Sequence, residues 1–231
     1  MNNFSISPIA IIHSPYKEKF AVPRQPGLVP SAHALLEILT PYDDINAFSG
    51  LEEFSHLWLM FVFHKNPQTE KFQPMVRPPR LGGNKRVGVF ATRSPNRPNP
   101  IGLSLVEFHG LLQKDKKLYL QLSNIDLVDG TPIVDIKPYI PYADSKENAI
   151  AGFAQHTPEV DIKTVNFSQQ AESIINEEQK QLIIEVLKQD PRPAYKKIKA
   201  DDKIYAMHLD EFNISWQVTN NIISVNNISL I

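Results

Sequence analysis

Gly-Leu-Ser-Leu-Val-Glu-Phe-His-Gly-Leu-Leu-Gln-Lys-Asp-Lys-Lys-Leu-Tyr-Leu-Gln-Leu, residues 102–122, is the stretch that decides the fold. Its two ends are mainly apolar, and the polar run from Lys114 to Lys117 separates them. A strand, a polar turn and a second strand in this order predict a β-hairpin, with strands at residues 102–111 and 118–122. We therefore expect a β-rich protein built mainly on antiparallel strands.

Apolar segments on both sides of the hairpin predict further strands. The segment 55–65 is almost continuously apolar and aromatic, so we expect a strand that is buried on both faces. Asp43 and Asp44 precede residues 45–54, where an acidic first turn indicates a short helix. The other strands predicted in this half of the chain are residues 4–12, 35–39, 87–91 and 133–136.

The composition changes after Gly152, because all nine glycines lie at or before that residue. Apolar residues then recur at helical spacing over residues 168–189, with Ser168 as the expected N-cap. Three more strands are predicted at residues 204–209, 212–218 and 222–230. We expect a β-rich domain over residues 1–145, a linker over residues 146–164 and a small α+β domain over residues 165–231.

The charge balance and the absence of cysteine exclude several classes of protein. The chain has 24 Lys and Arg against 25 Asp and Glu, so a polyanionic partner must bind at a local patch. Without cysteine there is no disulfide, no thiolate nucleophile and no Cys-based zinc site. The first residues lack the pattern of a signal peptide, and the apolar run at residues 57–63 is too short to span a bilayer. We therefore expect a cytoplasmic protein that does not enter a membrane.

Positive charge is concentrated just before the hairpin, because no Asp or Glu lies between Glu70 and Glu107. Such a local field raises the concentration of anions such as phosphates. Pro95, Pro98 and Pro100 fix the backbone at the end of this window and keep it out of the helical conformation. The window indicates either a rigid ligand-binding loop or a structural proline loop on an exposed rim. Its cations are Lys71, Arg77, Arg80, Lys85, Arg86, Arg93 and Arg97.

A second basic cluster surrounds Tyr195 near the start of the predicted C-terminal strands. An aromatic side chain among cations suits RNA, because backbone contacts and base stacking can combine there. A solvated charged rim would show the same pattern, and Asp201 and Asp202 offset part of the charge. The cations of this cluster are Arg192, Lys196, Lys197, Lys199 and Lys203.

The common signatures of nucleotide-binding and hydrolytic enzymes are missing from the chain. There is no Gly-x-Gly-x-x-Gly, no P-loop, no Gly-x-Ser-x-Gly and no His-Glu-x-x-His. Asp126, Asp129 and Asp135 could suggest a metal cluster, but we expect them to cap turns and contact a ligand, and we expect no metal. His64 and Lys65 end the apolar segment 55–65, where a polar pair either lines a site or simply marks the return to solvent.

Seven motifs occur in order along the chain. They are Phe-Ala-Val-Pro-Arg-Gln-Pro-Gly-Leu-Val (20–29), Gly-Leu-Glu-Glu-Phe-Ser-His-Leu-Trp (50–58), Val-Arg-Pro-Pro-Arg-Leu-Gly-Gly (76–83), Gly-Val-Phe-Ala-Thr-Arg-Ser (88–94), Arg-Pro-Asn-Pro-Ile-Gly (97–102), Asp-Leu-Val-Asp-Gly-Thr-Pro (126–132) and Asp-Pro-Arg-Pro-Ala-Tyr (190–195). Together, over nearly the whole chain, they resemble the TrmO (TsaA/YaeB-type) tRNA methyltransferases.

The resemblance implies an enzyme that uses S-adenosylmethionine to methylate N6 of threonylcarbamoyl-adenosine (t6A) at position 37 of tRNA, next to the anticodon, giving m6t6A. It also implies a small closed β-barrel with an appended α+β domain, working as a homodimer with the cofactor close to the subunit interface. The cofactor contacts carried over by motif are Gln25, Pro26, Gly27, His64, Lys65, Arg93, Leu103, Asp126, Leu127, Val128 and Asp129.

Methyl transfer is an in-line displacement that depends mainly on alignment, so few acid–base residues are needed. Asn99, between two prolines, is the candidate acceptor for the N6 hydrogen. We expect Arg97→Ala to raise the KM for tRNA more than the Kd for the cofactor. The residues expected to contact the tRNA anticodon loop are Arg77, Arg80, Arg86, Arg97, Arg192, Tyr195, Lys196 and Lys197.

Two other functions remain open at this point. A non-catalytic RNA-binding β-barrel would need the basic window but would not bind S-adenosylmethionine. A methylase of a small molecule would bind the cofactor but would show no salt-sensitive affinity for tRNA.

Overall fold

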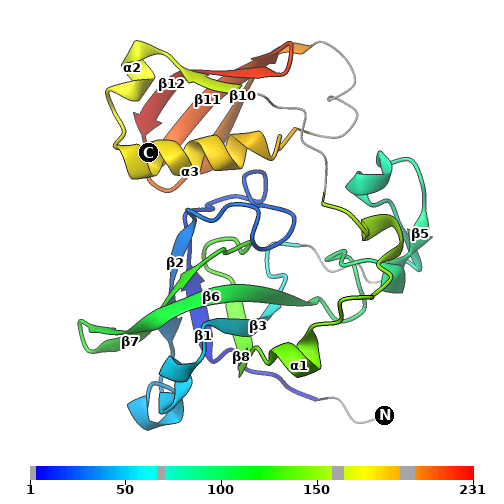
Figure 1. Ribbon diagram of the computed structural model, residues 1–231, viewed down its shortest axis with the longest axis vertical. Coiled ribbons are helices and arrows are strands. Elements are labelled where there is room, and N and C mark those ends of the chain that lie inside the picture. Colours follow the sequence, from blue (N-terminus) through cyan, green and yellow to red (C-terminus); the bar gives the residue numbers. More distant parts are fainter. Residues whose placement is uncertain (1–3, 67–70, 158–163, 193–200) are drawn as a thin grey trace.

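Six strands in the first half of the described chain pair in a ring and form a closed barrel (Figure 1). The computed structural model describes residues 4–66, 71–157, 164–192 and 201–231, with only the backbone of residues 201 and 202. Neighbouring strands are antiparallel in the order β1-β2-β7-β6-β3-β8, and β8 pairs back with β1. These strands are β1 (Ala10–His13), β2 (His33–Ile38), β3 (His56–Val62), β6 (Ile101–Lys114), β7 (Lys117–Ser123) and β8 (Pro132–Pro138).

The predicted hairpin is formed by β6 and β7. The chain reverses at Asp115 and Lys116, both with positive φ, which suits a tight turn between antiparallel strands. Alternate β6 residues Ser104, Val106 and Phe108 are buried, as expected for strands with one face toward a core. β6 is longer than predicted, because its pairing continues to the turn.

The prediction that the segment 55–65 is buried on both faces is wrong. In β3 only every second residue is buried, namely Leu57, Leu59 and Phe61. The opposite face has only partial cover: Trp58 packs edge-on against Tyr139 and donates a hydrogen bond to an oxygen of the Asp144 carboxylate. Asp144 belongs to the short helix α1 (Pro141–Asp144). The aromatic outer face is thus covered by a few side chains and not by a second layer.

Two other predicted segments of the first half are broken or shortened. Residues 45–54 form two short 3-10 helices, η1 (Ile45–Phe48) and η2 (Leu51–Glu53), because Gly50 between them has a φ of 83°. The predicted strand 4–12 begins only at Ala10. Pro8 has no backbone N–H to donate, which limits regular pairing before that point.

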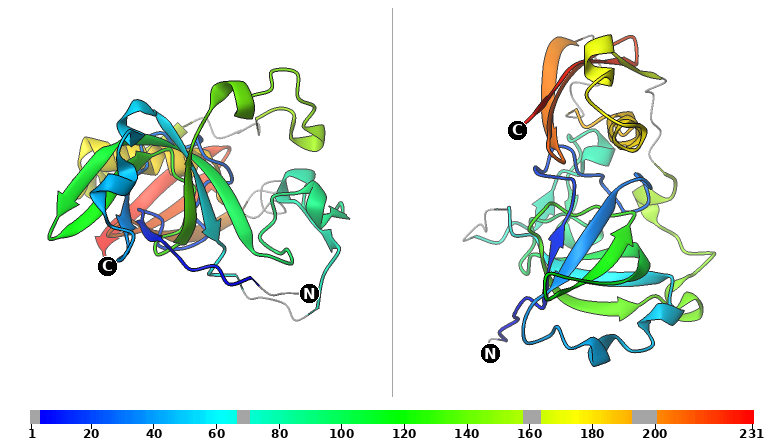
Figure 2. Two further views of the ribbon diagram at one scale, coloured as in Figure 1. Left: turned by 90° about the horizontal axis from the view of Figure 1, so that it is seen from below. Right: turned by 90° about the vertical axis from the view of Figure 1, so that its left-hand side faces the viewer.

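Residues 71–92, the part of the chain rich in Lys and Arg that precedes the proline-rich segment, form an arm beside the barrel (Figures 1 and 2). A two-stranded ribbon of β4 (Met75–Val76) and β5 (Val87–Gly88) lies at its base, with the 3-10 helix η3 (Pro79–Leu81) between the strands. The predicted strand 87–91 therefore ends after Gly88 and continues as the 3-10 helix η4 (Val89–Ala91). A further single turn, η5 (Gly152–Ala154), follows α1.

The second half has the predicted mixture of helix and strand, and it lies above the barrel in the view of Figure 1. Its sheet has the order β10-β11-β12-β9, and β9 pairs in parallel with β12. β9 was not predicted. The sheet strands are β9 (Thr164–Phe167), β10 (Asp201–Leu209), β11 (Phe212–Thr219) and β12 (Ile222–Leu230). Among the described residues, no helix has the length and apolar character needed to cross a membrane.

The predicted helix at residues 168–189 is two helices, α2 (Gln169–Glu172) and α3 (Glu177–Lys188). Ser168 is the N-cap of α2, as predicted, and its hydroxyl accepts a hydrogen bond from the Ala171 N–H. Asn176 starts α3 with a capping box, in which its side chain and that of Gln179 bond each other's backbone N–H. α3 covers one face of the sheet on the side toward the barrel (Figures 1 and 2).

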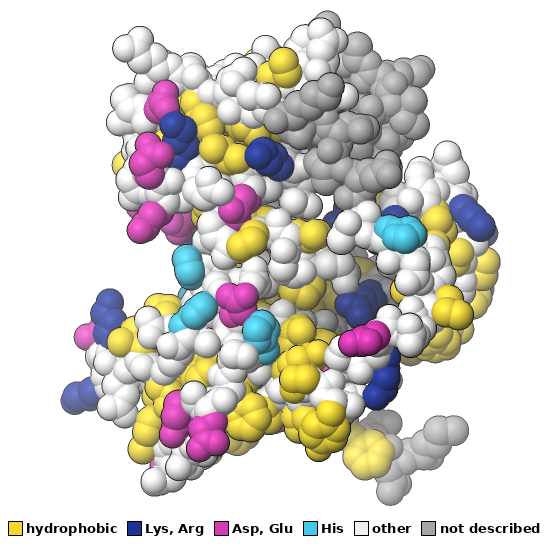
Figure 3. All heavy atoms as spheres, in the orientation of Figure 1, with side chains coloured by type: hydrophobic (Ala, Val, Ile, Leu, Met, Phe, Trp, Pro, Cys, Tyr) yellow, Lys and Arg dark blue, Asp and Glu magenta, His cyan; other side chains and the backbone are white. Residues whose placement is uncertain are grey.

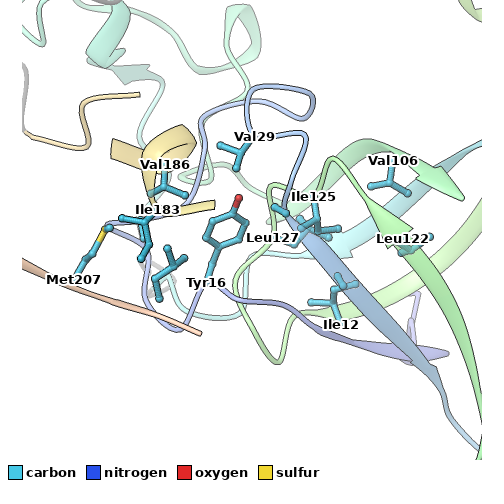
Figure 4. Packing of buried hydrophobic residues seen from close by; sticks show 14 of the residues in the cluster. Ile12, Tyr16, Val29, Val106, Leu122, Ile125, Leu127, Ile183, Val186 and Met207 are labelled. Carbon is cyan, nitrogen blue, oxygen red and sulfur yellow. The ribbon is translucent and has the colours of Figure 1, made fainter. Parts of the chain in front are cut away.

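The two halves share one continuous core. Tyr16, from the loop after β1, is fully buried near Val29 and Ile183, and Met207 belongs to the same buried cluster (Figure 4). The backbone around it is tied to the second half, because Asp210 N–H donates to the Pro15 carbonyl at 2.6 Å. The C-terminal unit is therefore packed against the barrel loops.

Candidate cofactor and RNA site

The loop between β1 and β2 contacts the segment of residues 93–100, which contains Pro95, Pro98 and Pro100 and is called the proline loop below. The contact is made by Gln25 and Arg93. Nη1 of Arg93 donates to Oε1 of Gln25 at 2.6 Å. Gly27 has a φ of +80°, which glycine adopts without strain. Two segments that are far apart in sequence, both predicted to contact the cofactor, are thus in direct contact.

The carboxylate of Asp126, in the segment after β7, interacts with the same arginine. Ser104, which is buried on β6, donates from its hydroxyl to Oδ1 of Asp126 at 2.5 Å. Burial raises the pKa of Asp126 to about 6, although the Ser104 hydrogen bond and the positive charge of Arg93 act in the opposite direction. The neighbouring Leu103 is 49% exposed. Arg93 and Asp126 therefore lie close to each other near the start of β6, while the Leu103 side chain lies on the outer face of that strand, opposite to Ser104.

Asp129 orders the segment that follows β1. One carboxylate oxygen accepts the Ser14 N–H at 2.9 Å, and the other lies 3.2 Å from Nζ of Lys17. The Asp129 N–H donates to the Tyr16 carbonyl at 2.9 Å. As expected for an Asp in a turn, this side chain caps backbone, and it also holds a lysine.

His64 and Lys65 lie beside the same segment. Nζ of Lys65 donates to the Lys17 carbonyl at 3.0 Å, and Nζ of Lys19 donates to the Lys65 carbonyl at 3.3 Å. Burial and the positive charge of Lys65 lower the pKa of His64. Contacts through Lys17 thus connect the end of β3 with Asp129.

Two of the three remaining cofactor candidates accept hydrogen bonds through their backbone carbonyls. The Leu127 side chain is buried in the core, and its carbonyl accepts the Ser14 hydroxyl at 2.7 Å. The Val128 carbonyl accepts the Thr131 hydroxyl at 2.5 Å. Pro26 precedes Gly27 at the tip of its loop and is half-buried.

In the proline loop, Asn99 and Arg97 differ in how free they are to meet a substrate. The Asn99 side chain is exposed and makes no hydrogen bond with the described residues, while its carbonyl accepts the Ile101 N–H at 2.7 Å. Arg97 is half-buried, and Nη1 donates to the carbonyls of Thr92 and Ser94 at 3.2 and 3.3 Å. Arg97 therefore stiffens its own loop.

The structure separates the predicted tRNA contacts into three groups. Arg77 and Arg86 are exposed on the arm, and Arg80 is half-buried in η3. Arg192 is only 4% exposed, and its guanidinium pairs with Asp190 at 2.8 Å, a placement that does not favour a phosphate contact. Tyr195, Lys196 and Lys197 lie outside the described residues.

Sequence reasoning missed Ser14 and Ser104 as parts of this site. Ser104 had a usable signal, because it is a polar residue at an inward position of a strand whose next inward residues are Val106 and Phe108. Asp135, in contrast, lies on β8 and pairs with Lys137 at 2.7 Å. No group of His, Asp or Glu that could hold a metal ion occurs among the described residues.

An open cavity of about 650 Å³ lies at the junction of the barrel and the C-terminal unit. Its lining includes three histidines, His13, His33 and His109, together with Lys17 from the segment held by Asp129. None of the residues predicted to bind the cofactor lines it. Ser14 and Lys17, which are held by Asp129, do line the cavity, so it borders the candidate site without including the predicted cofactor contacts themselves.

Both halves of the chain match models of one protein family. Residues 11–145 match the model of the tRNA-methyltransferase O N-terminal domain, and residues 161–231 match that of the TrmO C-terminal domain. The chain belongs to the TrmO family.

Full-length TrmO relatives are similar over almost the whole chain. A protein from Escherichia coli (strain K12), named tRNA (adenine(37)-N6)-methyltransferase, is 50% identical over an alignment of 226 residues that covers 95% of each chain. A Pseudomonas aeruginosa protein, named putative S-adenosylmethionine-dependent methyltransferase RcsF, is 45% identical over 92% of this chain and 91% of its own. The crystal structure of TrmO from Pseudomonas aeruginosa superposes with a TM-score of 0.79 at 37% identity, covering 100% of this chain and 98% of that one.

Proposed function

We propose that this TrmO-family chain is an S-adenosylmethionine-dependent tRNA methyltransferase that methylates N6 of t6A at position 37, giving m6t6A. The match of both halves to the family, at full length, is the observation that carries the proposal. The names of the relatives support the adenine, its position and the cofactor. Action on tRNA implies a cytoplasmic protein.

The residues around Arg93 have the chemistry that this cofactor requires. The cofactor is a cation at sulfur and carries a polar amino-acid end and an adenosine. The Asp126 carboxylate can face positive charge, and the Gln25 amide can hydrogen-bond polar groups. Leu103 leaves about half of its surface open as an apolar wall. These side chains fit the groups of S-adenosylmethionine, and the electrophilic methyl group comes from the cofactor itself.

When bound, S-adenosylmethionine supplies an electrophilic methyl group. The chain must then hold the target N6 in line with that methyl, and alignment of this kind lowers the barrier by about 7–11 kcal/mol in favourable systems. The N6 proton leaves as the new bond forms. The exposed carboxamide of Asn99, whose carbonyl accepts the Ile101 N–H, is our candidate for the hydrogen-bond acceptor that orients the N6–H, and the released proton then passes to solvent water.

The exposed arginines of the arm, Arg77 and Arg86, are proposed to contact the anticodon-loop phosphates. Residue 37 lies in an unpaired loop, so moving its base toward the barrel end has a low unstacking cost.

The variant Asn99→Ala tests the role of Asn99. Full turnover of this variant at saturating tRNA would show that Asn99 takes no part in the reaction, without changing the proposed substrate.

Mass spectrometry of tRNA nucleosides tests the activity directly. The protein is incubated with methyl-labelled S-adenosylmethionine and tRNA that contains t6A, and the labelled product is expected to be m6t6A. If the label appears in adenosine without the threonylcarbamoyl group, the substrate is unmodified adenosine and not t6A. Cofactor binding without any label in tRNA would support a methylase of small molecules, and the absence of cofactor binding would support an RNA-binding barrel.

We also propose that the chain forms a homodimer through the side of the barrel that carries the arm. Phe72 and Phe90 are 52% and 73% exposed, and their rings stack with centroids 6.3 Å apart. Figure 3 shows hydrophobic side chains gathered over this arm. Such a patch on an ordered arm is typical of a protein interface. Sedimentation should show a dimer that the double substitution Phe72→Ser and Phe90→Ser converts to a monomer.

A further inference from the structure

Helix α3 of the C-terminal unit contacts the loop that carries Gln25 and Gly27. Oε2 of Glu185 accepts two hydrogen bonds from Ser31, one from its N–H at 2.9 Å and one from its hydroxyl at 2.7 Å. One helical turn further, Nε2 of Gln189 donates to the Leu28 carbonyl at 3.2 Å. The helix therefore fixes the part of the loop that directly follows Gly27.

The contacting residues form one stripe along α3. Gln181, Glu185 and Gln189 are four residues apart and so lie on the same side of the helix. Nε2 of Gln181 donates to Oε1 of Glu185 at 2.7 Å, which orients the carboxylate toward Ser31. Burial acts to raise the pKa of Glu185, but hydrogen bonds from Ser31 and Gln181 lower it below its usual value, so the charged acceptor is favoured.

The loop between β1 and β2 thus has two anchors, one on each side of Gly27. Before Gly27, Gln25 is held by Arg93, and after it Ser31 is held by Glu185. Glycine has more backbone freedom than any other residue, so a loop released at one anchor would sample many conformations. A binding loop that is ordered in advance avoids this cost when its ligand binds.

We propose that Glu185 is a positioning residue for the cofactor: it holds Ser31 and so keeps Gln25, Pro26 and Gly27 in their binding conformation. This inference rests on the proposed cofactor contacts of Gln25, Pro26 and Gly27. It makes the C-terminal unit a working part of the cofactor site, because α3 supplies one of the two anchors.

Three α3 variants, Glu185→Ala, Glu185→Gln and Glu177→Ala, test the proposal in the full-length protein. Glu177 is exposed on the same helix and serves as the matched control. The Kd for S-adenosylmethionine is measured by calorimetry, and backbone amide exchange is measured over residues 22–32. For Glu185→Ala we expect the Kd to rise about tenfold, the equivalent of about 1.4 kcal/mol. Exchange in this loop should become faster, while kcat at saturating cofactor changes little.

Glu185→Gln keeps one acceptor oxygen for Ser31 and should recover most of the affinity and of the exchange protection. Glu177→Ala should leave both unchanged. Equal affinity and equal loop exchange in the wild type and Glu185→Ala would overturn the proposal, and so would a Glu185→Gln variant as impaired as Glu185→Ala.

Arg93→Ala separates this inference from the proposed function. If the wild type binds the cofactor and only Arg93→Ala weakens that binding, the role of Glu185 falls and the cofactor site stands. If the wild type does not bind S-adenosylmethionine, the proposed function and the role of Glu185 both fall.

Discussion

The ring of Phe61 lies over the backbone of Gly102, its cross-strand partner between β3 and β6. A Cβ on residue 102 would lie 2.5 and 2.6 Å from Cε2 and Cε1 of that ring and still nearer to Cζ. Gly102 is therefore required by space rather than by an unusual backbone conformation. Gly102 directly precedes Leu103 and Ser104, so this close contact lies next to the candidate site.

Gly102→Ala should destabilise the barrel, because the added methyl group must displace the Phe61 ring. Overpacking of this kind costs about 1–3 kcal/mol. In thermal unfolding, each kcal/mol should lower the Tm by about 2–4 °C for a chain of this size. Gly88→Ala is the control, since no atom lies within 4 Å of a Cβ added there and its φ is −58°.

A smaller side chain at position 61 should relieve the overlap. We expect Phe61→Leu combined with Gly102→Ala to be more stable than the sum of the two single changes predicts. Strictly additive losses would show that the ring and the glycine do not interact as the structure indicates.

Asp126 should make the stability of the wild-type protein depend on pH. Its pKa is about 6 when folded against an ordinary value of 3.8, so between these values the folded state binds more protons than the unfolded chain. Stability from this group is therefore present at low pH and is lost as the pH rises to about 6. The total loss is on the order of 3 kcal/mol.

Urea unfolding of wild type and Asp126→Asn from pH 4 to pH 8 measures this effect. Other ionisable groups cancel in the difference, and the Asn oxygen can still accept the Ser104 hydroxyl. The wild type should lose stability relative to the variant as the pH rises through this range. A difference that does not change with pH would contradict the burial of this carboxyl.

The hairpin and the C-terminal strands could be predicted because their apolar patterns and turns are local in sequence. β9 could not, since it has four residues and pairs in parallel with β12, more than fifty residues later. The error at β3 has a different origin. An almost continuous apolar run does not tell whether the outer face meets a second layer or only a few aromatic side chains such as Trp58 and Tyr139.

Contacts between segments that are far apart in sequence also limited the prediction of the candidate site. The motifs indicated Gln25 and Arg93, but their hydrogen bond joins loops 68 residues apart and depends on the register of the barrel. The partners Ser104 and Glu185 belong to no motif that we used. Arg192 shows the opposite error, because a cation counted as exposed charge in the sequence is buried against Asp190.

Asn176 separates α2 from α3, and its capping box should contribute measurably to stability. Asn176→Ala removes the side-chain acceptor for the Gln179 N–H, which lies 2.9 Å away. We expect a loss of about 1 kcal/mol in the free energy of unfolding. Asn176→Ser should restore most of this loss, because serine also caps helices. Equal losses for Ala and Ser would show that the cap does not stabilise α3.

The arginines of the arm and of the proline loop should differ in what they bind. Arg86 is exposed, so Arg86→Ala should weaken tRNA binding and leave the Kd for S-adenosylmethionine unchanged. Each lost contact with a single-strand phosphate should lower the slope of log affinity against log salt by about 0.7. Arg97 instead holds the carbonyls of Thr92 and Ser94, next to Arg93.

Arg97→Ala should therefore weaken cofactor binding as well as tRNA binding, which revises the expectation from sequence alone. Calorimetry with S-adenosylmethionine and tRNA titrations at several salt concentrations measure both affinities, with Lys114→Ala at the hairpin tip as the control for lost charge. Lys114 is exposed on β6, at the end away from the proline loop. If Arg97→Ala lowers only the tRNA affinity, its bonds to Thr92 and Ser94 do not support the cofactor site, and Arg97 acts on the phosphates directly.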